Sequence, residues 1–224
     1  LTLFRLGMED SILSVVTHHV IADCWSMGLP FQVTPVENAP WSSGIFFQDL
    51  FTCYKDLASG LESSPCPPAY SYDDYLAWQE TMFRDSHFVS HQNYWSSLLT
   101  GAPRQLNLPF DHPAPLEFLY QGHRREFSIP ADLKNEVERF SRHNSTTPFV
   151  TMIQAFCITL ERWSGSEDFL VGTPVPNRAD PALRDVIGLF SHTLPIRYQP
   201  GQKSTQALTQ QVSDLHRFAA FPVE

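Results

Sequence analysis

The most informative part of the chain is Ser11-Ile-Leu-Ser-Val-Val-Thr-His-His-Val-Ile-Ala-Asp23. Its first part, Ser11 to His19, is apolar and β-branched, which predicts a buried β-strand. Side chains alternate across a strand, so we expect His18 and His19 to face opposite ways and not to share a metal ion. The two histidines and Asp23 therefore predict either a catalytic site or, alternatively, two structural histidines that are satisfied by hydrogen bonds.

Helices and strands alternate along the rest of the chain. The clearest helix begins at Thr147-Pro148, carries one apolar stripe and is bounded by Gly165. We expect the helix to pack inward by this stripe, which consists of Phe149, Met152, Ile153, Phe156, Leu160 and Trp163. Further helices are expected over 45–58, 72–83, 88–99, 130–142 and 204–218, and strands over 122–129, 169–173 and 193–198. This alternation predicts an α/β sandwich.

Composition narrows the class of protein. The chain has 224 residues, enough for one large domain or two small lobes, and its formal net charge of −9 argues against a nucleic-acid partner. No apolar run approaches the roughly 20 residues that span a bilayer, so we expect no membrane partner. Four cysteines without metal-ligand spacing predict free thiols in a reducing, cytoplasmic compartment and no metal site.

Several segments, taken together and in order, resemble the motifs of one family. His18-His19-x-x-x-Asp23, followed by Trp25-Ser26, resembles the signature of condensation domains of nonribosomal peptide synthetases. Further segments resemble later motifs of this family in the same order: Tyr72 to Gln79, Tyr94-Trp95 with Leu98 to Pro103, Leu106 to Pro113, Trp163 to Asp168, Val171 to Arg178, and Ile187 to Arg197. Each match alone is weak, but their shared order is specific.

The resemblance implies a particular architecture. The family has the two-lobed, chloramphenicol acetyltransferase-like α/β sandwich, in which helices flank mixed β-sheets and a tunnel runs between the lobes. In these terms, residues 1–105 are expected to form the C-terminal part of an incomplete N-terminal lobe that carries the His-His-x-x-x-Asp motif. Residues 106–224 are expected to form most of the C-terminal lobe.

The resemblance also implies a reaction, which is amide formation between a donor thioester and an acceptor amine. Both substrates would be carried on the phosphopantetheine arms of donor and acceptor peptidyl carrier domains, beside an adenylation domain of the same assembly line. No cofactor is expected on the domain itself. Two alternatives stay open: an inactive module that docks carrier proteins, and a related acyltransferase or epimerisation domain of the same fold. Activity of this chain by itself is also left open.

The family motif assigns roles to particular residues. An α-amine has a pKa of about 8, so the site must hold it neutral, align it and support the oxyanion. The resemblance makes His19 the catalytic residue, as a general base or as the group that orients the amine, and His18 a structural one. Asp23 is expected to pair with Arg178 and support the site; the alternative is that Arg178 is simply solvated at a strand end.

Two features depart from the family pattern. Cys24 stands where the family has glycine, a candidate oxyanion or tunnel position, and a left-handed conformation there would cost about 1–2 kcal/mol. A nucleophilic Cys24 is disfavoured because no repositioned base is evident. Residues 29–44 interrupt the family pattern, either as an inserted loop or as non-native sequence such as an unremoved intron. For an insertion, we expect an irregular loop and a following helix that begins near Ser42 or Ser43 with a serine cap.

Overall fold

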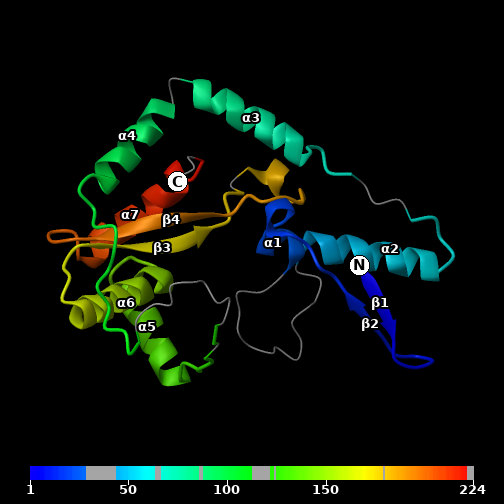
Figure 1. The fold of residues 1–224 in the computed structure, drawn as a ribbon, viewed down its shortest axis with the longest axis horizontal. Coiled ribbons are helices and arrows are strands. Elements are labelled where there is room, and N and C mark those ends of the chain that lie inside the picture. The colour runs from blue at the N-terminus through cyan, green and yellow to red at the C-terminus, as the bar shows by residue number, and fades with distance from the viewer. Residues whose placement is uncertain are drawn as a thin grey trace. The chain divides into compact units, whose positions relative to one another are not determined.

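The computed structural model describes residues 1–28, 44–63, 67–85, 88–112, 122–123, 125–178 and 180–220 (Figure 1). Contacts between Cα atoms group the chain into two compact units. The first consists of residues 1–81 and 176–191, and the second of residues 82–175 and 192–224. These units are groups of mutual contacts, and the expected lobes over 1–105 and 106–224 stay a prediction.

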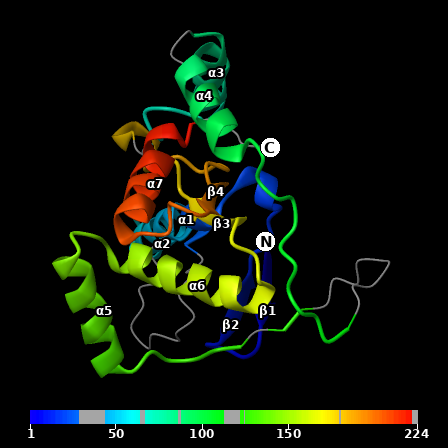
Figure 2. The ribbon, with the colours of Figure 1, turned by 90° about the vertical axis from the view of Figure 1, so that its left-hand side faces the viewer.

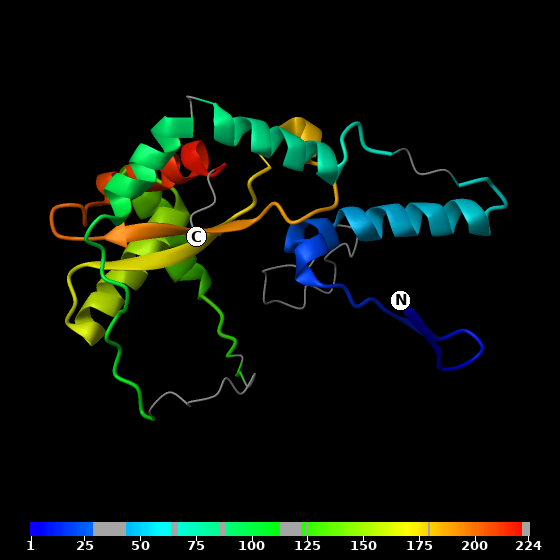
Figure 3. The same ribbon diagram turned by 45° about the horizontal axis from the view of Figure 1, so that its top comes forward.

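The first unit opens with an antiparallel hairpin of β1 (Thr2–Arg5) and β2 (Ser11–Ser14), drawn in dark blue in Figure 3. The predicted strand over Ser11 to His19 is therefore too long, and its side chains are exposed or half-buried instead of buried. Among the described residues, β2 pairs only with β1. The strand ends at Ser14, before the histidines, and His18 caps the short 3-10 helix η1 (His19–Ile21). The two histidines consequently do not alternate across a strand.

Two helices follow η1 in the first unit. Helix α1 (Cys24–Met27) is capped by Asp23 and ends at Gly28, whose φ of 67° is in the left-handed region that favours glycine. Helix α2 (Ile45–Ala58) begins at Ile45, with Gly44 as an N-cap that has no side chain to offer. The expected serine-capped start near Ser42 or Ser43 is wrong, because the backbone is still extended at Gly44 (φ −98°, ψ 145°). The expected loop over 29–44 lies, except for Gly44, outside the described residues.

Aromatic packing completes the first unit. Helix α3 (Tyr72–Arg84) places Tyr75 against Val186 and Phe190, and these three residues form a small buried cluster. The chain between β3 and β4 supplies the latter two and includes the 3-10 helix η3 (Pro181–Leu183). This segment carries most of the partners of the candidate site.

The second unit contains α4 (Phe88–Leu99), α5 (Ala131–His143), α6 (Pro148–Ser164) and α7 (Thr205–Phe218), together with strands β3 (Phe169–Val175) and β4 (His192–Tyr198). The two strands are antiparallel, with Val171 opposite Ile196. These elements confirm the predicted helices and the last two predicted strands to within two residues at most ends. The predicted strand over 122–129 is wrong: its described residues form no strand and have no strand partner there.

Helices α6 and α7 share a core with β4, and Figure 2 shows both helices beside the β3–β4 ribbon. The buried members are Trp95, Val150, Val175, Leu194, Ile196, Leu208, Leu215 and Ala219. The ends of α6 follow its capping residues: Thr147 accepts a hydrogen bond from the Val150 amide, and Gly165 closes the helix with a φ of 69°.

The predicted inward face of α6 is largely wrong. Phe149, Phe156 and Trp163 are 45%, 50% and 69% exposed, whereas Val150 and Cys157 are fully buried. Successive helical residues are rotated by about 100°, so a one-residue error in phase turns a different stripe inward. The neighbouring sheet and α7 select the phase, and apolarity alone did not show it. No described helix is long and apolar enough to cross a membrane.

Candidate active site

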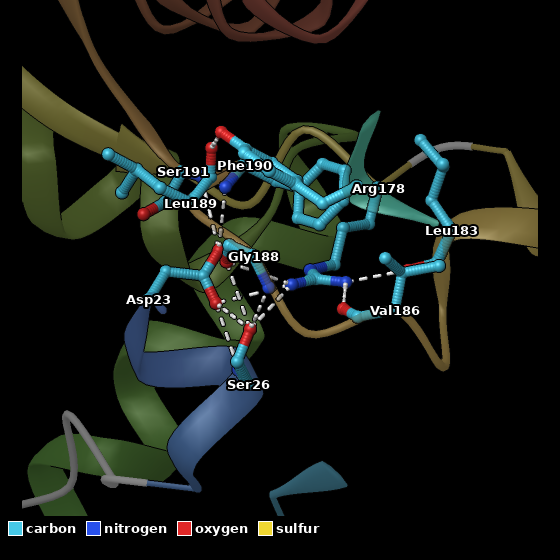
Figure 4. Close-up of polar contacts among 10 residues, drawn as sticks. Asp23, Ser26, Arg178, Leu183, Val186, Gly188, Leu189, Phe190 and Ser191 are labelled. Atoms are coloured by element: carbon cyan, nitrogen blue, oxygen red, sulfur yellow. Dashed lines mark hydrogen bonds and ion pairs between the residues drawn. The ribbon is translucent and has the colours of Figure 1, made fainter. Parts of the chain in front are cut away.

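Asp23 lies at the centre of a buried polar cluster in the first unit (Figure 4). As the N-cap of α1, it accepts two hydrogen bonds from Ser26 at Oδ1, from the amide and from the hydroxyl, both at 2.8 Å. Its Oδ2 accepts hydrogen bonds from the amides of Phe190 at 3.1 Å and Ser191 at 3.2 Å. The carboxylate therefore joins the start of α1 to the turn before β4.

Arg178 supplies the opposite charge, and the expected pair is confirmed. Its Nη2 lies 3.3 Å from Asp23 Oδ1 and donates to the Ser26 hydroxyl at 2.8 Å. Its Nη1 donates to the carbonyls of Leu183 at 2.6 Å and Val186 at 2.7 Å. The Arg178 side chain is 2% exposed, so it is not solvated at a strand end. One guanidinium thus fixes η3 and α1 together.

The surroundings of Asp23 and Arg178 keep the carboxylate and the guanidinium charged. Burial on its own raises the pKa of the Asp23 carboxyl, but hydrogen bonds from Ser26, the charge of Arg178 and the Phe190 amide outweigh it and hold the pKa below its ordinary value. The guanidinium stays protonated and lies 4.0 Å above the Phe190 ring. Its Nε finds no hydrogen-bond partner among the described residues. Buried ions destabilise a fold unless they are paired and hydrogen-bonded. Removal of either Asp23 or Arg178 should therefore strongly reduce the stability of the folded protein.

Ser26 is a residue of this cluster to which the sequence assigned no role. Its hydroxyl oxygen accepts from Arg178 Nη2 and from the Gly188 amide at 3.1 Å, which uses both acceptor sites. Its single proton lies between Asp23 Oδ1 at 2.8 Å and the Gly188 carbonyl at 3.0 Å. The signal was the Asp-x-x-Ser spacing, which places a serine at the third helical position after an acidic N-cap.

Close packing on Gly188 fixes the turn that receives Asp23. A Cβ at this position would overlap the Tyr72 ring. The Tyr72 hydroxyl donates to the Leu189 carbonyl at 2.9 Å, and burial raises the pKa of this phenol. Asn177, in a left-handed conformation with a φ of 48°, donates to the Tyr75 hydroxyl at 3.2 Å. Aromatic residues of α3 therefore hold the far side of the cluster.

The two histidines take different places. His18 accepts the Val20 amide hydrogen at Nδ1, at 3.1 Å, so that nitrogen carries no proton and His18 stabilises η1. His19 is exposed, and its ring makes no hydrogen bond with another described residue. Ala22 and Asp23 are buried shortly after it. An anchored backbone therefore presents a free imidazole, which can act on a substrate.

Cys24 does not have the expected strain. It is the first residue of α1, half-buried, and is not among the residues with positive φ. The left-handed residue near the motif is Gly28, four positions later, because it ends the helix. Cys24, Cys53 and Cys157 are free thiols. Burial raises the pKa of Cys157 to about 11, so this thiol is unreactive at neutral pH. The described residues contain no group of three or more metal-ligating side chains.

Comparison with known proteins identifies the family. The model of the Condensation domain family matches residues 40–219, a range that begins after the His18–Asp23 motif. Phosphinothricin tripeptide synthetase PhsC of Streptomyces viridochromogenes is 34% identical over 210 residues, which are 93% of this chain and 18% of the relative. Malpinin synthetase of Mortierella alpina is 33% identical over 213 residues, 94% of this chain and 2% of the relative. The chain thus spans less than a fifth of the relatives that it matches.

Solved structures share the fold. The X-domain from teicoplanin biosynthesis, also solved in complex with OxyB, has a TM-score of 0.83 at 21% identity, over 98% of this chain and 48% of that one. The first condensation domain of the CDA synthetase has a TM-score of 0.63 at 20% identity, over 92% of this chain and 42% of that one. The expected α/β fold of condensation domains is therefore confirmed, and the chain spans just under half of each structure.

Proposed function

Because this chain belongs to the condensation-domain family, we propose that it serves amide-bond formation between a donor thioester and an acceptor amine in nonribosomal peptide synthesis. Both substrates would arrive on the phosphopantetheine arms of peptidyl carrier domains, from an assembly line that also contains an adenylation domain. The observation that carries the proposal is the exposed His19, which lies four residues before Asp23 of the buried Asp23–Arg178 ion pair.

His19 would act on the acceptor amine. A thioester is already activated, so the chemical task is to present a neutral amine in line with the carbonyl and to remove its proton as the bond forms. A free imidazole nitrogen suits this role, either as the base or as the acceptor that orients the amine. His18 cannot share it through Nδ1, since that atom already accepts the Val20 amide.

Asp23, Arg178 and Ser26 would position His19 without touching the substrate. Their side chains are buried and their hydrogen bonds are directed at one another and at the 183–191 backbone. A cluster of this kind fixes the start of α1, which directly follows η1, and so limits where the His19 backbone can lie. It thus contributes to the rate through the placement of the imidazole.

The test is a single-turnover assay with the chain extended by its neighbouring coding sequence and with loaded donor and acceptor carriers. We expect an amide product with the combined mass of both acyl groups. The His19→Ala variant should form it at least about 100-fold more slowly, as expected for loss of general-base catalysis. The matched control is His123→Ala, an exposed histidine outside the cluster. Equal rates for His19→Ala and the parent protein would overturn the role of His19.

A second candidate is a docking module that binds carrier proteins without catalysis. Two observations favour it: Cys24 stands at the family's glycine, and a domain of this fold has been solved in complex with a partner protein. Carrier binding without amide product in the parent protein would support this candidate. A racemised acyl group, or transfer from coenzyme A, would instead support a related epimerisation or acyltransfer reaction.

A further inference from the structure

A pocket of about 400 Å³ lies in the first unit, beside the segment that Arg178 anchors. The start of α3 supplies one wall and η3 the other. The lining residues are Tyr70, Asp74, Tyr75, Trp78, Asp180, Ala182 and Leu183. Arg178 donates to the Leu183 carbonyl, so the η3 wall is held by the buried cluster. Neither Asp23 nor His19 lines the pocket, and the proposed amide formation makes no use of it.

Aromatic faces make up much of the pocket wall. The rings of Tyr75 and Trp78 lie 5.8 Å apart between centroids, tilted by 30°. Tyr75 is buried and fixes the geometry, whereas Trp78 and Tyr70 are 47% and 51% exposed. The partly exposed rings of Trp78 and Tyr70 are favourable surfaces for a cation, because the faces of aromatic rings carry negative charge density.

Two carboxylates complete the wall, and none of the described residues that line the pocket is a lysine, arginine or histidine. Asp74 Oδ2 accepts from the amide and hydroxyl of Ser71 at 2.8 and 2.7 Å, and these bonds lower the pKa of Asp74. Asp180 Oδ1 accepts from the Ala182 amide at 2.9 Å. The second oxygen of each carboxylate accepts no hydrogen bond from another described residue and is left for a ligand, while the first one fixes the direction of the side chain.

We propose that this pocket binds the guanidinium group of an arginine side chain on a partner peptide. A guanidinium is planar, stacks on aromatic rings and donates to carboxylates from one fork. These properties match a cavity lined by the partly exposed rings of Tyr70 and Trp78 and by two carboxylates. An anion would be repelled by Asp74 and Asp180. A neutral apolar group would desolvate both carboxylates without a hydrogen bond in return.

The test is a titration of the 224-residue chain with N-acetylarginine amide, followed by the NMR shift of the Trp78 indole N–H, which a Trp78→Phe sample identifies. We expect a saturable shift. The N-acetylcitrulline analogue has nearly the same shape without the charge and should bind at least tenfold more weakly. A ten-residue peptide with one arginine should bind more tightly than the amide alone if the ligand is a peptide segment. Equal binding of the peptide and the amide would overturn the peptide partner.

Variants separate this site from general effects of charge. Asp74→Asn with Asp180→Asn keeps an acceptor oxygen at both caps, so the fold is expected to persist, and binding should weaken at least tenfold. The matched control, Asp73→Asn, removes an exposed carboxylate of α3 that does not line the pocket, and its affinity should stay within twofold. Citrulline binding equal to arginine binding, or a double variant with unchanged affinity, would overturn the proposal.

Discussion

At the scale of single residues, Asp23 has several structural roles that a surface carboxylate does not have. It caps α1, accepts two amides of the 190–191 turn and pairs with Arg178, all from a fully buried position. Each of these interactions compensates part of the cost of burying a charge. The same carboxylate therefore holds three segments that are far apart in the sequence.

The Asp23→Ala variant should be strongly destabilised, because Arg178 would keep its charge in a buried place without a partner. We expect the free energy of unfolding in urea to fall by about 3–5 kcal/mol. Asp23→Asn keeps the cap and should lose less. Asp10→Ala, which removes an exposed acid, should stay within about 0.5 kcal/mol of the parent protein. A loss below 1 kcal/mol for Asp23→Ala would refute the structural role given to the pair.

The contribution of the Asp23 carboxylate to stability should also be visible in the pH dependence of unfolding. The pKa of Asp23 is lower in the folded protein than its ordinary value of 3.8, so its stabilising contribution is present above that value and is lost as the pH falls through the folded pKa. We expect the unfolding free energy to decline below about pH 4 and the decline to be shallower in Asp23→Asn. Part of it must persist, since Glu161 and Asp168 also have lowered pKa values. Equal slopes for the two proteins would contradict this assignment.

The Ser26→Ala variant tests the structural role of the hydroxyl of Ser26, a residue to which the sequence motif assigned no role. The change deprives the Gly188 amide and Arg178 Nη2 of an acceptor in a buried place. We expect a loss of about 1–3 kcal/mol in urea unfolding. Ser213→Ala on the exposed side of α7 serves as the control and should be nearly neutral. If both serine variants unfold alike, the hydroxyl is not the link that its distances indicate.

At the scale of elements, α6 shows where a sequence pattern loses precision. Its length, cap and end could be read from Thr147-Pro148 and Gly165, because these depend on local chemistry. Its inward face could not, since apolar residues lie on both sides of the helix and the sheet selects one. Val150→Ala should therefore cost about 2 kcal/mol in unfolding free energy, and Phe156→Ala less than about 1 kcal/mol although it removes more atoms. The reverse order would restore the predicted face.

The junction of α1 and α2 bears on residues 29–44. Gly44 lies so close to Gly28 that a Cβ on Gly44 would overlap the Gly28 backbone, so the ends of this segment meet. Deletion of residues 29–44 should leave the thermal midpoint unchanged or raise it, because closing a long loop costs entropy. Unfolding on deletion would instead show that the segment belongs to the fold.

At the scale of the whole molecule, the order of the motifs along the chain predicted the family. It also predicted the Asp23–Arg178 pair, whose two residues are far apart in the sequence. The prediction of a strand over Ser11 to His19 was wrong, for a reason that lies outside the local sequence. Its composition suits a buried strand, yet the described part of the chain pairs β2 only with β1, and the strand ends at Ser14, before His18 caps η1. Strand length depends on partners that a local pattern does not contain.

Amide formation by the Asp23→Asn variant shows whether the buried cluster positions His19. If the buried cluster positions His19, this variant should bind loaded carriers as the parent protein does and form amide about 10- to 100-fold more slowly in a single turnover, because a small displacement of a catalytic group has an effect of that order. The assay is run at a temperature at which circular dichroism shows both proteins folded. A rate within twofold of the parent protein would contradict the claim that Asp23, Ser26 and Arg178 position the catalytic histidine.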